Sequence, residues 1–170
     1  MSKQDLMTID LNLTEVNRML GGLAEAGKDT SPLMRKIAGT MAAMTALNFQ
    51  DEGNPPWEPS LAAKERSGET LSASGHLRRS ITEKYDVGHA MIGTNVEYAA
   101  THQLGLTLNH TSRPSKDRRK PDMMTKAWKQ KFPARPFLPV DANGKPQKGL
   151  EEKVLALATD FLREAANGPG

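Results

Sequence analysis

The sequence predicts a small α+β protein with a small antiparallel sheet, a central β-hairpin and long N-terminal and C-terminal helices that pack on it. Apolar residues alternate with period two over 81–92, and two apolar stripes elsewhere have helical spacing. A third feature, a run of Lys and Arg over 109–131, predicts an extended basic loop. The length of 170 residues suits one domain with one main core. We therefore expect a single domain over 1–170, with the basic insert spanning 106–132 and a flexible tail at 167–170.

The N-terminal part is predicted to hold one strand and two helices. Apolar residues alternate with polar ones over 7–13, which indicates a half-buried strand. Thr14 is suited to cap a first helix that reaches Leu23. A second helix starts near Ser31, since Pro32 fits the first turn, and runs to about Phe49. Its apolar stripe consists of Met34, Ile37, Met41 and Met44. Such a stripe is typical of a core, and an adaptable methionine binding face is the alternative.

The middle of the chain predicts a stiff loop and a hairpin. Three prolines within 52–60 exclude a helix there, and Trp57 among them is suited to anchor the loop. Residues 61–73 have little pattern, and Ser74 then caps a short helical turn. Strands are expected over 81–87 and 90–92, with a tight turn at Gly88.

The C-terminal part alternates between local helix and extended chain. Asn95 is suited to cap a short helix over 96–104, which Gly105 ends. Prolines recur at every third position over 133–139, which permits an extended or edge-strand path but no central strand. A turn over 141–144 leads to a final helix whose apolar positions are Leu150, Val154, Leu157 and Phe161.

Charge is concentrated in the insert. The segment 109–131 holds eight basic and two acidic residues, although the whole chain has a net charge of only +3. Its polar, Pro-containing composition predicts an exposed loop that we expect to be mobile. Contact with a nucleic-acid backbone and contact with another protein are both open for these charges.

Most enzyme chemistry finds no pattern in the sequence. The chain has no cysteine, which excludes disulfides, thiolate catalysis and cysteine metal sites. Residues 22–28 match the start of a phosphate-binding loop, but Asp29 replaces the required Ser or Thr. The four histidines, His76, His89, His102 and His110, lack metal-ligand spacing. Because these catalytic and ligand patterns are missing, we expect no enzyme, cofactor or metal site. No long apolar run or signal region is present, so we also expect no membrane span.

Four motifs in a fixed order go further than composition. They are the Trp57 loop over 49–59, the Gly75 turn within 71–81, the stretch 92–105 with Tyr98 and His102, and the Arg135-Pro-Phe-Leu sequence within 133–138. In this order they resemble the phage virion morphogenesis family, which includes tail completion proteins of contractile-tailed phages and Mu-like prophages. The resemblance covers about residues 5–165. The stretch 106–132 does not map onto that pattern.

The resemblance implies a viral structural protein that catalyses nothing. It implies a neck or tail-end component made in the host cytoplasm, which completes the tail and joins it to the DNA-filled head. The expected partners are further copies in a hexameric ring and other neck, connector and tail proteins, with packaged DNA passing through the ring. A small nucleic-acid-binding protein that uses residues 113–131 is the alternative.

The candidate functional residues follow from these expectations. Candidates for subunit interfaces or loop anchoring are Trp57, Tyr98, His102, Arg135 and Phe137. Candidates for a loop that faces DNA or a protein partner are Arg113, Lys116, Arg118, Arg119 and Lys120. Arg135, held extended between prolines, suits an ion pair to a neighbouring subunit.

Overall fold

The computed structural model describes residues 14, 18–19, 21–22, 29–112 and 126–167. The predicted strand over 7–13 and most of the first helix lie outside these residues, although Thr14, Met19 and the neighbouring described residues are helical. In chain order the elements are α2 (Ser31–Gln50), α3 (Leu61–Glu65), α4 (His76–Arg79), β1 (Thr82–Tyr85), β2 (Ala90–Gly93), α5 (Ala99–Leu104), β3 (Leu106–His110), β4 (Trp128–Phe132) and α6 (Leu150–Ala166).

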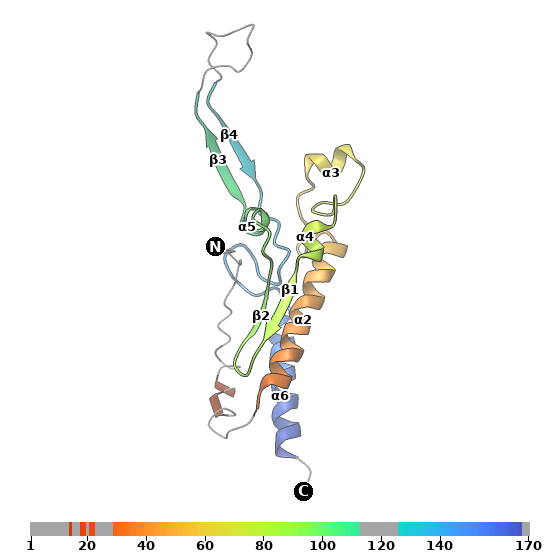
Figure 1. Ribbon diagram of the computed structural model, residues 1–170, viewed down its shortest axis with the longest axis vertical. Helices are drawn as coiled ribbons and strands as arrows, with labels where there is room; N and C mark the ends of the chain where they lie inside the picture. Colours follow the sequence, from red (N-terminus) through yellow and green to blue (C-terminus); the bar gives the residue numbers. More distant parts are fainter. Residues whose placement is uncertain (1–13, 15–17, 20, 23–28, 113–125, 168–170) are drawn as a thin grey trace.

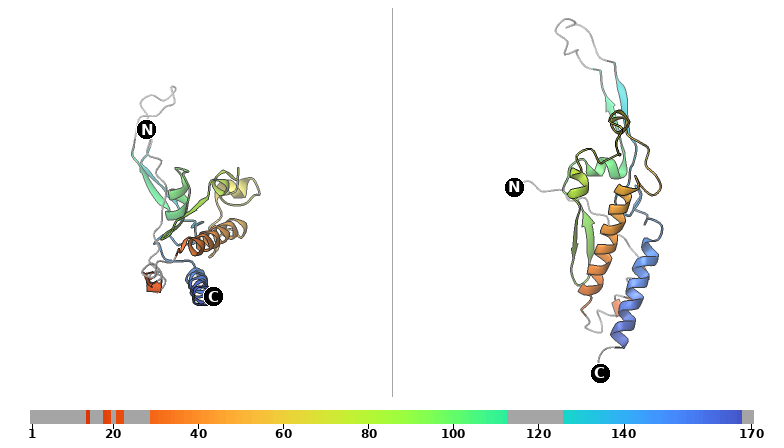
Figure 2. Two further views of the ribbon diagram at one scale, coloured as in Figure 1. Left: turned by 60° about the horizontal axis from the view of Figure 1, so that its bottom comes forward. Right: turned by 90° about the vertical axis from the view of Figure 1, so that its right-hand side faces the viewer.

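The architecture is α+β, as predicted, and the strands form two separate two-stranded antiparallel sheets. Helices α2 and α6 lie side by side, and the β1–β2 hairpin runs along α2 on another side (Figures 1 and 2). The β3–β4 pair projects from the opposite end of the molecule to the C-terminus (Figure 1). The body is therefore a helix pair plus one hairpin, and the second hairpin is an arm.

Helix α2 confirms the predicted apolar stripe as core. Pro32 occupies its first turn, and the backbone N–H of Ser31 donates to Asp29 Oδ1 at 2.9 Å. The stripe packs against α6 in a first hydrophobic cluster, which excludes the methionine binding face. Its buried members are Leu33, Met34, Ile37, Met41, Met44, Leu150, Val154 and Ala158. The predicted amphipathic final helix is likewise confirmed in α6.

The predicted β1–β2 hairpin is present, and its register defines which side chains share a face. Glu83 pairs with Ile92 and Tyr85 with Ala90, so these four side chains share one face. Ala90 and Ile92 pack against the first cluster. Between the strands, Asp86 Oδ1 accepts backbone N–H bonds from the two residues that close the turn, Gly88 and His89. The hairpin is thus held both by its turn and by α2.

Three local features test the predictions between the long elements. Asn95 was wrongly expected to cap α5, which begins at Ala99, because Thr94 Oγ1 instead accepts the Val96 N–H in a separate turn. A short helix, α3, occupies part of the weakly patterned 61–73 segment and is capped by the Ser60 side chain. The predicted turn before α4 is confirmed at Gly75, which has φ of +66°.

The insert over 106–132 is not a loop throughout. Its two ends form the β3–β4 ladder, with Leu106 opposite Phe132 and His110 opposite Trp128. Cross-strand pairing satisfies the backbone groups of both segments, which composition alone did not reveal. The tip, 113–125, lies outside the described residues.

A second hydrophobic cluster lies at the C-terminal end of α2, where the proline-rich 133–140 segment enters the body. Phe49 packs edge-on against Trp57, with ring centroids 5.9 Å apart, and lies 5.5 Å from Phe137. Phe137, Leu138 and the neighbouring Pro139 are nearly inaccessible to solvent. The segment forms no regular strand, as its prolines predict, but it bends at Leu138 and Pro139 and is central to the core. None of the described helices is long and apolar enough to cross a membrane.

Candidate assembly surfaces

The base of the β3–β4 arm is locked to the body by a close backbone crossing. Gly105 has φ of +73°, and a Cβ there would lie 2.8 Å from the Ala134 backbone nitrogen. One residue further on, the Arg135 N–H donates to the His102 carbonyl at 2.6 Å. Only glycine combines this backbone conformation with this approach, so Gly105 sets the direction in which the arm leaves.

Gln103 is the buried side chain that holds the returning strand. Its Oε1 accepts the backbone N–H groups of Phe137 and Leu138, both at 3.0 Å, and its Nε2 donates to the Val140 carbonyl at 2.8 Å. The side chain has 0% exposure. One side-chain amide thus satisfies three backbone groups of a segment whose prolines prevent regular strand pairing.

A second amide pair ties the same segment to α2 and to the approach to α6. Asn48 and Gln147 exchange side-chain hydrogen bonds of 3.0 Å each. Asn48 Nδ2 also donates to the Phe137 carbonyl at 3.1 Å. These contacts connect three distant parts of the chain, so the 133–147 region has a defined position in the core.

Trp57 and Phe137 both lie in the second hydrophobic cluster. Trp57 Nε1 donates to the Pro136 carbonyl at 2.9 Å, and both rings are buried in the second cluster. The anchoring role expected for Trp57 therefore has a direct physical basis. A role of either residue in contacts between subunits stays a prediction.

Arg135 is a buried cation. Its exposed fraction is 6%, and its Nε donates to the Glu58 carbonyl at 2.7 Å. Burial lowers the pKa of the guanidinium, and the nearby Glu58 carboxylate offsets part of this effect. The contact joins the Trp57 loop to the arm base, while an ion pair to a neighbouring subunit stays a prediction.

Tyr98 and His102 lie beside the arm base. Their rings meet edge-on with centroids 5.7 Å apart, and Tyr98 is 46% exposed. Burial, and secondarily the charge of Arg135, lower the pKa of His102. Both causes disfavour the charged imidazolium next to the Arg135 guanidinium.

The β3–β4 arm has two chemically different faces. Opposite residues in an antiparallel ladder share a face, so the register separates apolar and aromatic side chains from polar ones. The first face, called the apolar arm face below, consists of Leu106, Leu108, His110, Trp128, Gln130 and Phe132. The second face carries Thr107, Asn109, Lys129 and Lys131.

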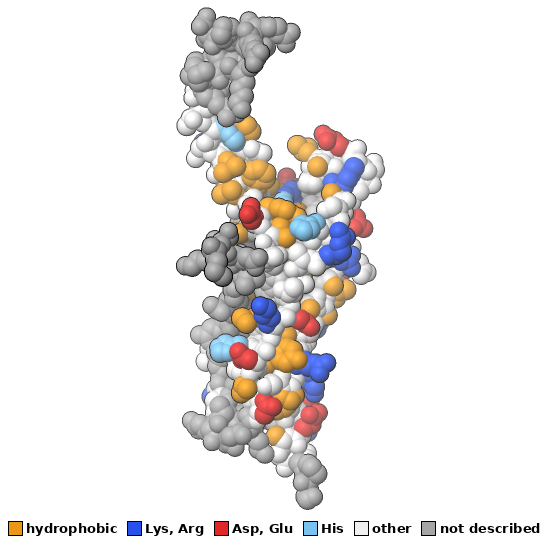
Figure 3. Space-filling view, in the orientation of Figure 1, with side chains coloured by type: hydrophobic (Ala, Val, Ile, Leu, Met, Phe, Trp, Pro, Cys, Tyr) orange, Lys and Arg blue, Asp and Glu red, His pale blue; other side chains and the backbone are white. Residues whose placement is uncertain are grey.

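The apolar arm face is open to solvent. Leu106, Leu108 and Trp128 are 42%, 39% and 53% exposed. At its outer end the His110 and Trp128 rings stack, with centroids 4.0 Å apart and planes within 9°. In Figure 3 a notch separates the arm from the lobe that carries α3, and hydrophobic side chains gather near the arm base. Exposed apolar surface of this kind marks interaction sites.

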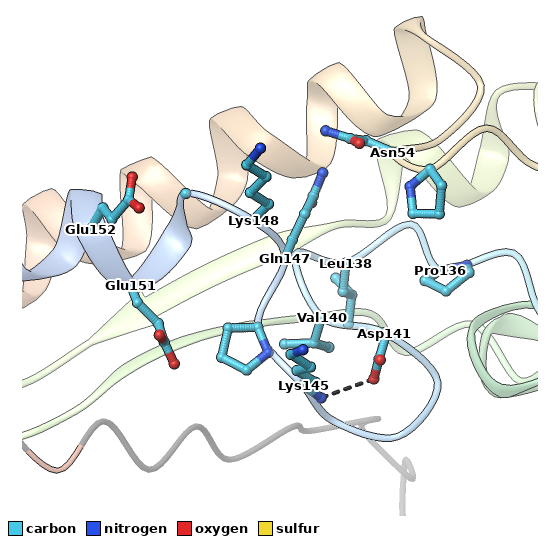
Figure 4. Close-up of a pocket in the computed structure, with 13 residues that line it drawn as sticks. Asn54, Pro136, Leu138, Val140, Asp141, Lys145, Gln147, Lys148, Glu151 and Glu152 are labelled. Carbon is cyan, nitrogen blue, oxygen red and sulfur yellow. Dashed lines mark hydrogen bonds between the residues drawn. The ribbon is translucent and has the colours of Figure 1, made fainter.

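A cavity of about 620 Å³ opens beside the start of α6. Leu138 and Val140 lie in its middle, and the carboxylates of Glu151 and Glu152 extend from the helix at one end (Figure 4). Asp141 lies at the edge and holds its own turn through the Lys145 backbone N–H at 2.9 Å. Backbone N–H groups of Lys145 and Asn143 hold the pKa of Asp141 below its ordinary value. The cavity thus combines apolar walls with a charged rim of three carboxylates and two lysines.

Neither the basic candidates nor a metal site forms part of this described geometry. The five basic candidates, Arg113, Lys116, Arg118, Arg119 and Lys120, lie outside the described residues. Within the described ranges, no three His, Asp or Glu side chains are grouped so that they could hold a metal ion.

Two features of the structure, the buried amide side chains and the β3–β4 arm, are absent from the sequence predictions. The burial of Gln103 and Asn48 could not be predicted, because Asn and Gln residues are mostly exposed in proteins. The arm did have a signal: Leu106, Leu108 and His110 alternate with polar residues at period two. The concentrated charge that follows them directed attention to a loop instead.

Comparisons with known proteins agree with one another. The model of the phage virion morphogenesis family matches residues 11–156. The Mu-like prophage FluMu G protein 2 of Haemophilus influenzae is 43% identical over 94 residues, which is 55% of this chain and 66% of that protein. The putative capsid assembly protein G of Escherichia phage Mu is 28% identical over 156 residues, 83% of this chain and 90% of that protein. The chain thus spans slightly less than two thirds of the first relative. No solved structure matches it.

Proposed function

Since the chain belongs to the phage virion morphogenesis family, we propose that it is a tail completion protein whose copies form a neck ring between tail and DNA-filled head. The observation that carries this proposal is the family match over 11–156, which includes α2, both hairpins and the start of α6. A structural or assembly role in the virion follows from the family. The position at the neck and the ring are the parts that we propose.

The shape of the subunit supports an assembly role. The described residues place an arm with an open apolar face on a body whose core is held by buried amides. A rigid body with a projecting hairpin that exposes apolar side chains is suited to contact a neighbouring subunit in a ring. The name of the phage Mu relative, a putative capsid assembly protein, supports the same class of role.

Quantitative mass spectrometry of particles tests the proposal. We would compare complete virions with separated heads and separated tails from the source phage. The proposal expects a few copies per virion, about one ring, concentrated with tails or necks. A gene deletion should leave filled heads and tails that do not join.

Two outcomes would overturn the neck assignment. Presence at high copy number in heads alone would indicate a capsid component. Absence from finished particles would indicate a transient assembly factor or the nucleic-acid alternative, which salt-dependent DNA binding by the purified protein would identify.

A further inference from the structure

The apolar arm face has an incomplete environment in the single chain. The β3–β4 hairpin projects beyond α2 and α6 (Figures 1 and 2), and three large apolar residues of its apolar face are at least 39% exposed. An isolated two-stranded hairpin is marginally stable in water, and an apolar face on it favours a cover. The arm therefore has physical reason to bind another surface.

Charge selects the kind of surface. The described part of the arm, from Leu106 to Ser112 and from Lys126 to Phe132, carries three lysines and no carboxylate. Lys129 and Lys131 lie on the second face and Lys126 precedes β4, so the three charges surround the apolar arm face and do not lie on it. The favoured partner surface is consequently apolar with acidic side chains at its rim.

The body of the same chain presents such a surface. The cavity beside α6 has apolar walls that include Leu138 and Val140, and Asp141, Glu151 and Glu152 contribute carboxylates. Both glutamates are exposed in the first turn of α6. Lys145 and Lys148 also line it, so carboxylates exceed ammonium groups at its edge by one.

We propose that the apolar arm face of one copy docks on the cavity beside α6 of a second copy. The inference rests on the proposed function, because it supplies the contact between neighbouring subunits of the ring. Arm face and cavity are different surfaces of one chain, so the contact is head-to-tail and each copy can both give an arm and receive one. Repetition of such a contact generates a closed ring when the rotation between copies permits closure.

Cysteine cross-linking tests this contact directly, because the chain has no cysteine of its own. The variant Gln130→Cys/Glu151→Cys places one thiol on the apolar arm face and one on the cavity rim. Treated with a short bismaleimide, purified protein and purified particles should give a ladder of dimers, trimers and larger species. Each single variant should give monomers.

Two matched controls keep the ladder specific. Asn109→Cys/Glu151→Cys moves the first thiol to the other face of the arm, one residue from the apolar face. Gln130→Cys/Glu164→Cys moves the second thiol to the far end of α6. Both should lose most of the ladder.

Three results would overturn the contact. Dimers from Gln130→Cys alone would show arm-to-arm pairing, and a cross-linked monomer would show that the arm folds onto its own body. Particle-bound protein without a ladder would show that another protein covers the arm. That last result refutes the contact and leaves the neck role standing. If the purified protein gives a ladder but the protein itself is absent from virions, the neck role alone is refuted.

A substitution pair gives an independent measurement. Leu108→Ser on the apolar arm face should weaken self-association at least about tenfold, since truncation at the centre of an interface removes buried contacts. Thr107→Ser, on the opposite face, should leave it within about twofold. Sedimentation velocity measures both, with circular dichroism as the folding control, and equal effects of the two variants would contradict the proposal.

Discussion

The two hairpins of this protein are close in size and opposite in environment. The β1–β2 hairpin pairs four residues with four, lies along α2 and contributes Ala90 and Ile92 to the core. The β3–β4 hairpin pairs five with five and extends away from the helices (Figure 1). Two-stranded pairing alone does not decide stability, because a hairpin depends on what covers its apolar face. The first hairpin is covered within the chain, and the second offers its face outward.

The difference lies in how each hairpin is attached. The first is secured along its length, including the Thr30 hydroxyl, which donates to the Val87 carbonyl at its turn. Among the described residues, the second is secured at its base, where Gly105 crosses the Ala134 backbone and Gln103 holds the segment that follows β4. A rigid base with a free shaft lets the arm bind a partner without loss of its direction. Four predictions test this comparison.

Gln103→Leu should have the largest effect on the free energy of unfolding. The substitution keeps the volume but leaves three buried main-chain groups, those of Phe137, Leu138 and Val140, without partners. We expect destabilisation of about 4 kcal/mol. Urea denaturation followed by tryptophan fluorescence measures it. Gln130→Leu, on the arm, is the control, and equal losses for the two variants would contradict the anchoring role of Gln103.

Gly105→Ala should destabilise the arm base by about 2 kcal/mol, because its φ is unfavourable for alanine and its Cβ would meet the backbone of Ala134. Gly144→Ala is the matched control, since Gly144 has φ of +80° but a Cβ at that position would have no neighbouring atom within 4 Å. The control should lose only about 1 kcal/mol. Thermal unfolding distinguishes the two, and a larger loss at Gly144 would show that crowding at Gly105 is unimportant.

Ile92→Thr and Leu108→Thr compare the hairpins directly. Ile92 packs against both hydrophobic clusters, so its substitution should cost about 1 kcal/mol of unfolding free energy. Leu108 is exposed on the arm, and its substitution should cost less than about 0.5 kcal/mol at concentrations where the protein is monomeric. Chemical denaturation measures both values. A Leu108 cost as large as that of Ile92 would mean that the arm is covered within its own chain.

His102 should give the smallest effect, a pH dependence of stability. Its pKa is below the ordinary value of 6.5 in the folded protein, so the unfolded chain binds the proton more readily. Stability should therefore fall as the pH drops through about 6.5 and level off below the folded pKa. The variant His102→Gln should flatten this part of the melting-temperature profile. His76→Gln, at an exposed site, should leave the profile unchanged, and a flattening by His76→Gln instead would assign the effect elsewhere.

Much of the local structure could be predicted from the sequence. Helices α2 and α6 were predicted because apolar residues such as Met34, Ile37 and Val154 recur with the helical period. The first hairpin was predicted because its alternation is bounded by a turn at Gly88. The cap of α5 was missed because Thr94 competes with Asn95 for nearby N–H groups, and both residue types favour caps.

The candidate site was predicted only in part. Trp57 is predicted from the sequence as a loop-anchoring or subunit-interface residue, and in the structure its Nε1 donates to the Pro136 carbonyl. The sequence gives no indication of the role of Gln103, and the many Lys and Arg residues of 109–131 favour a loop over the short apolar alternation that forms β3.

The class of fold, the long helices, the first hairpin and the resemblance to a phage assembly family follow from the amino-acid order, because they depend on local period and on the order of motifs. Tertiary structure alone decided that Gln103 serves Phe137, that Arg135 is buried against the Glu58 carbonyl, and that one hairpin is covered while the other is not. These outcomes depend on which distant segments meet. Burial and hydrogen-bond partners depend on the tertiary contacts between these segments, and the type of a residue does not specify those contacts.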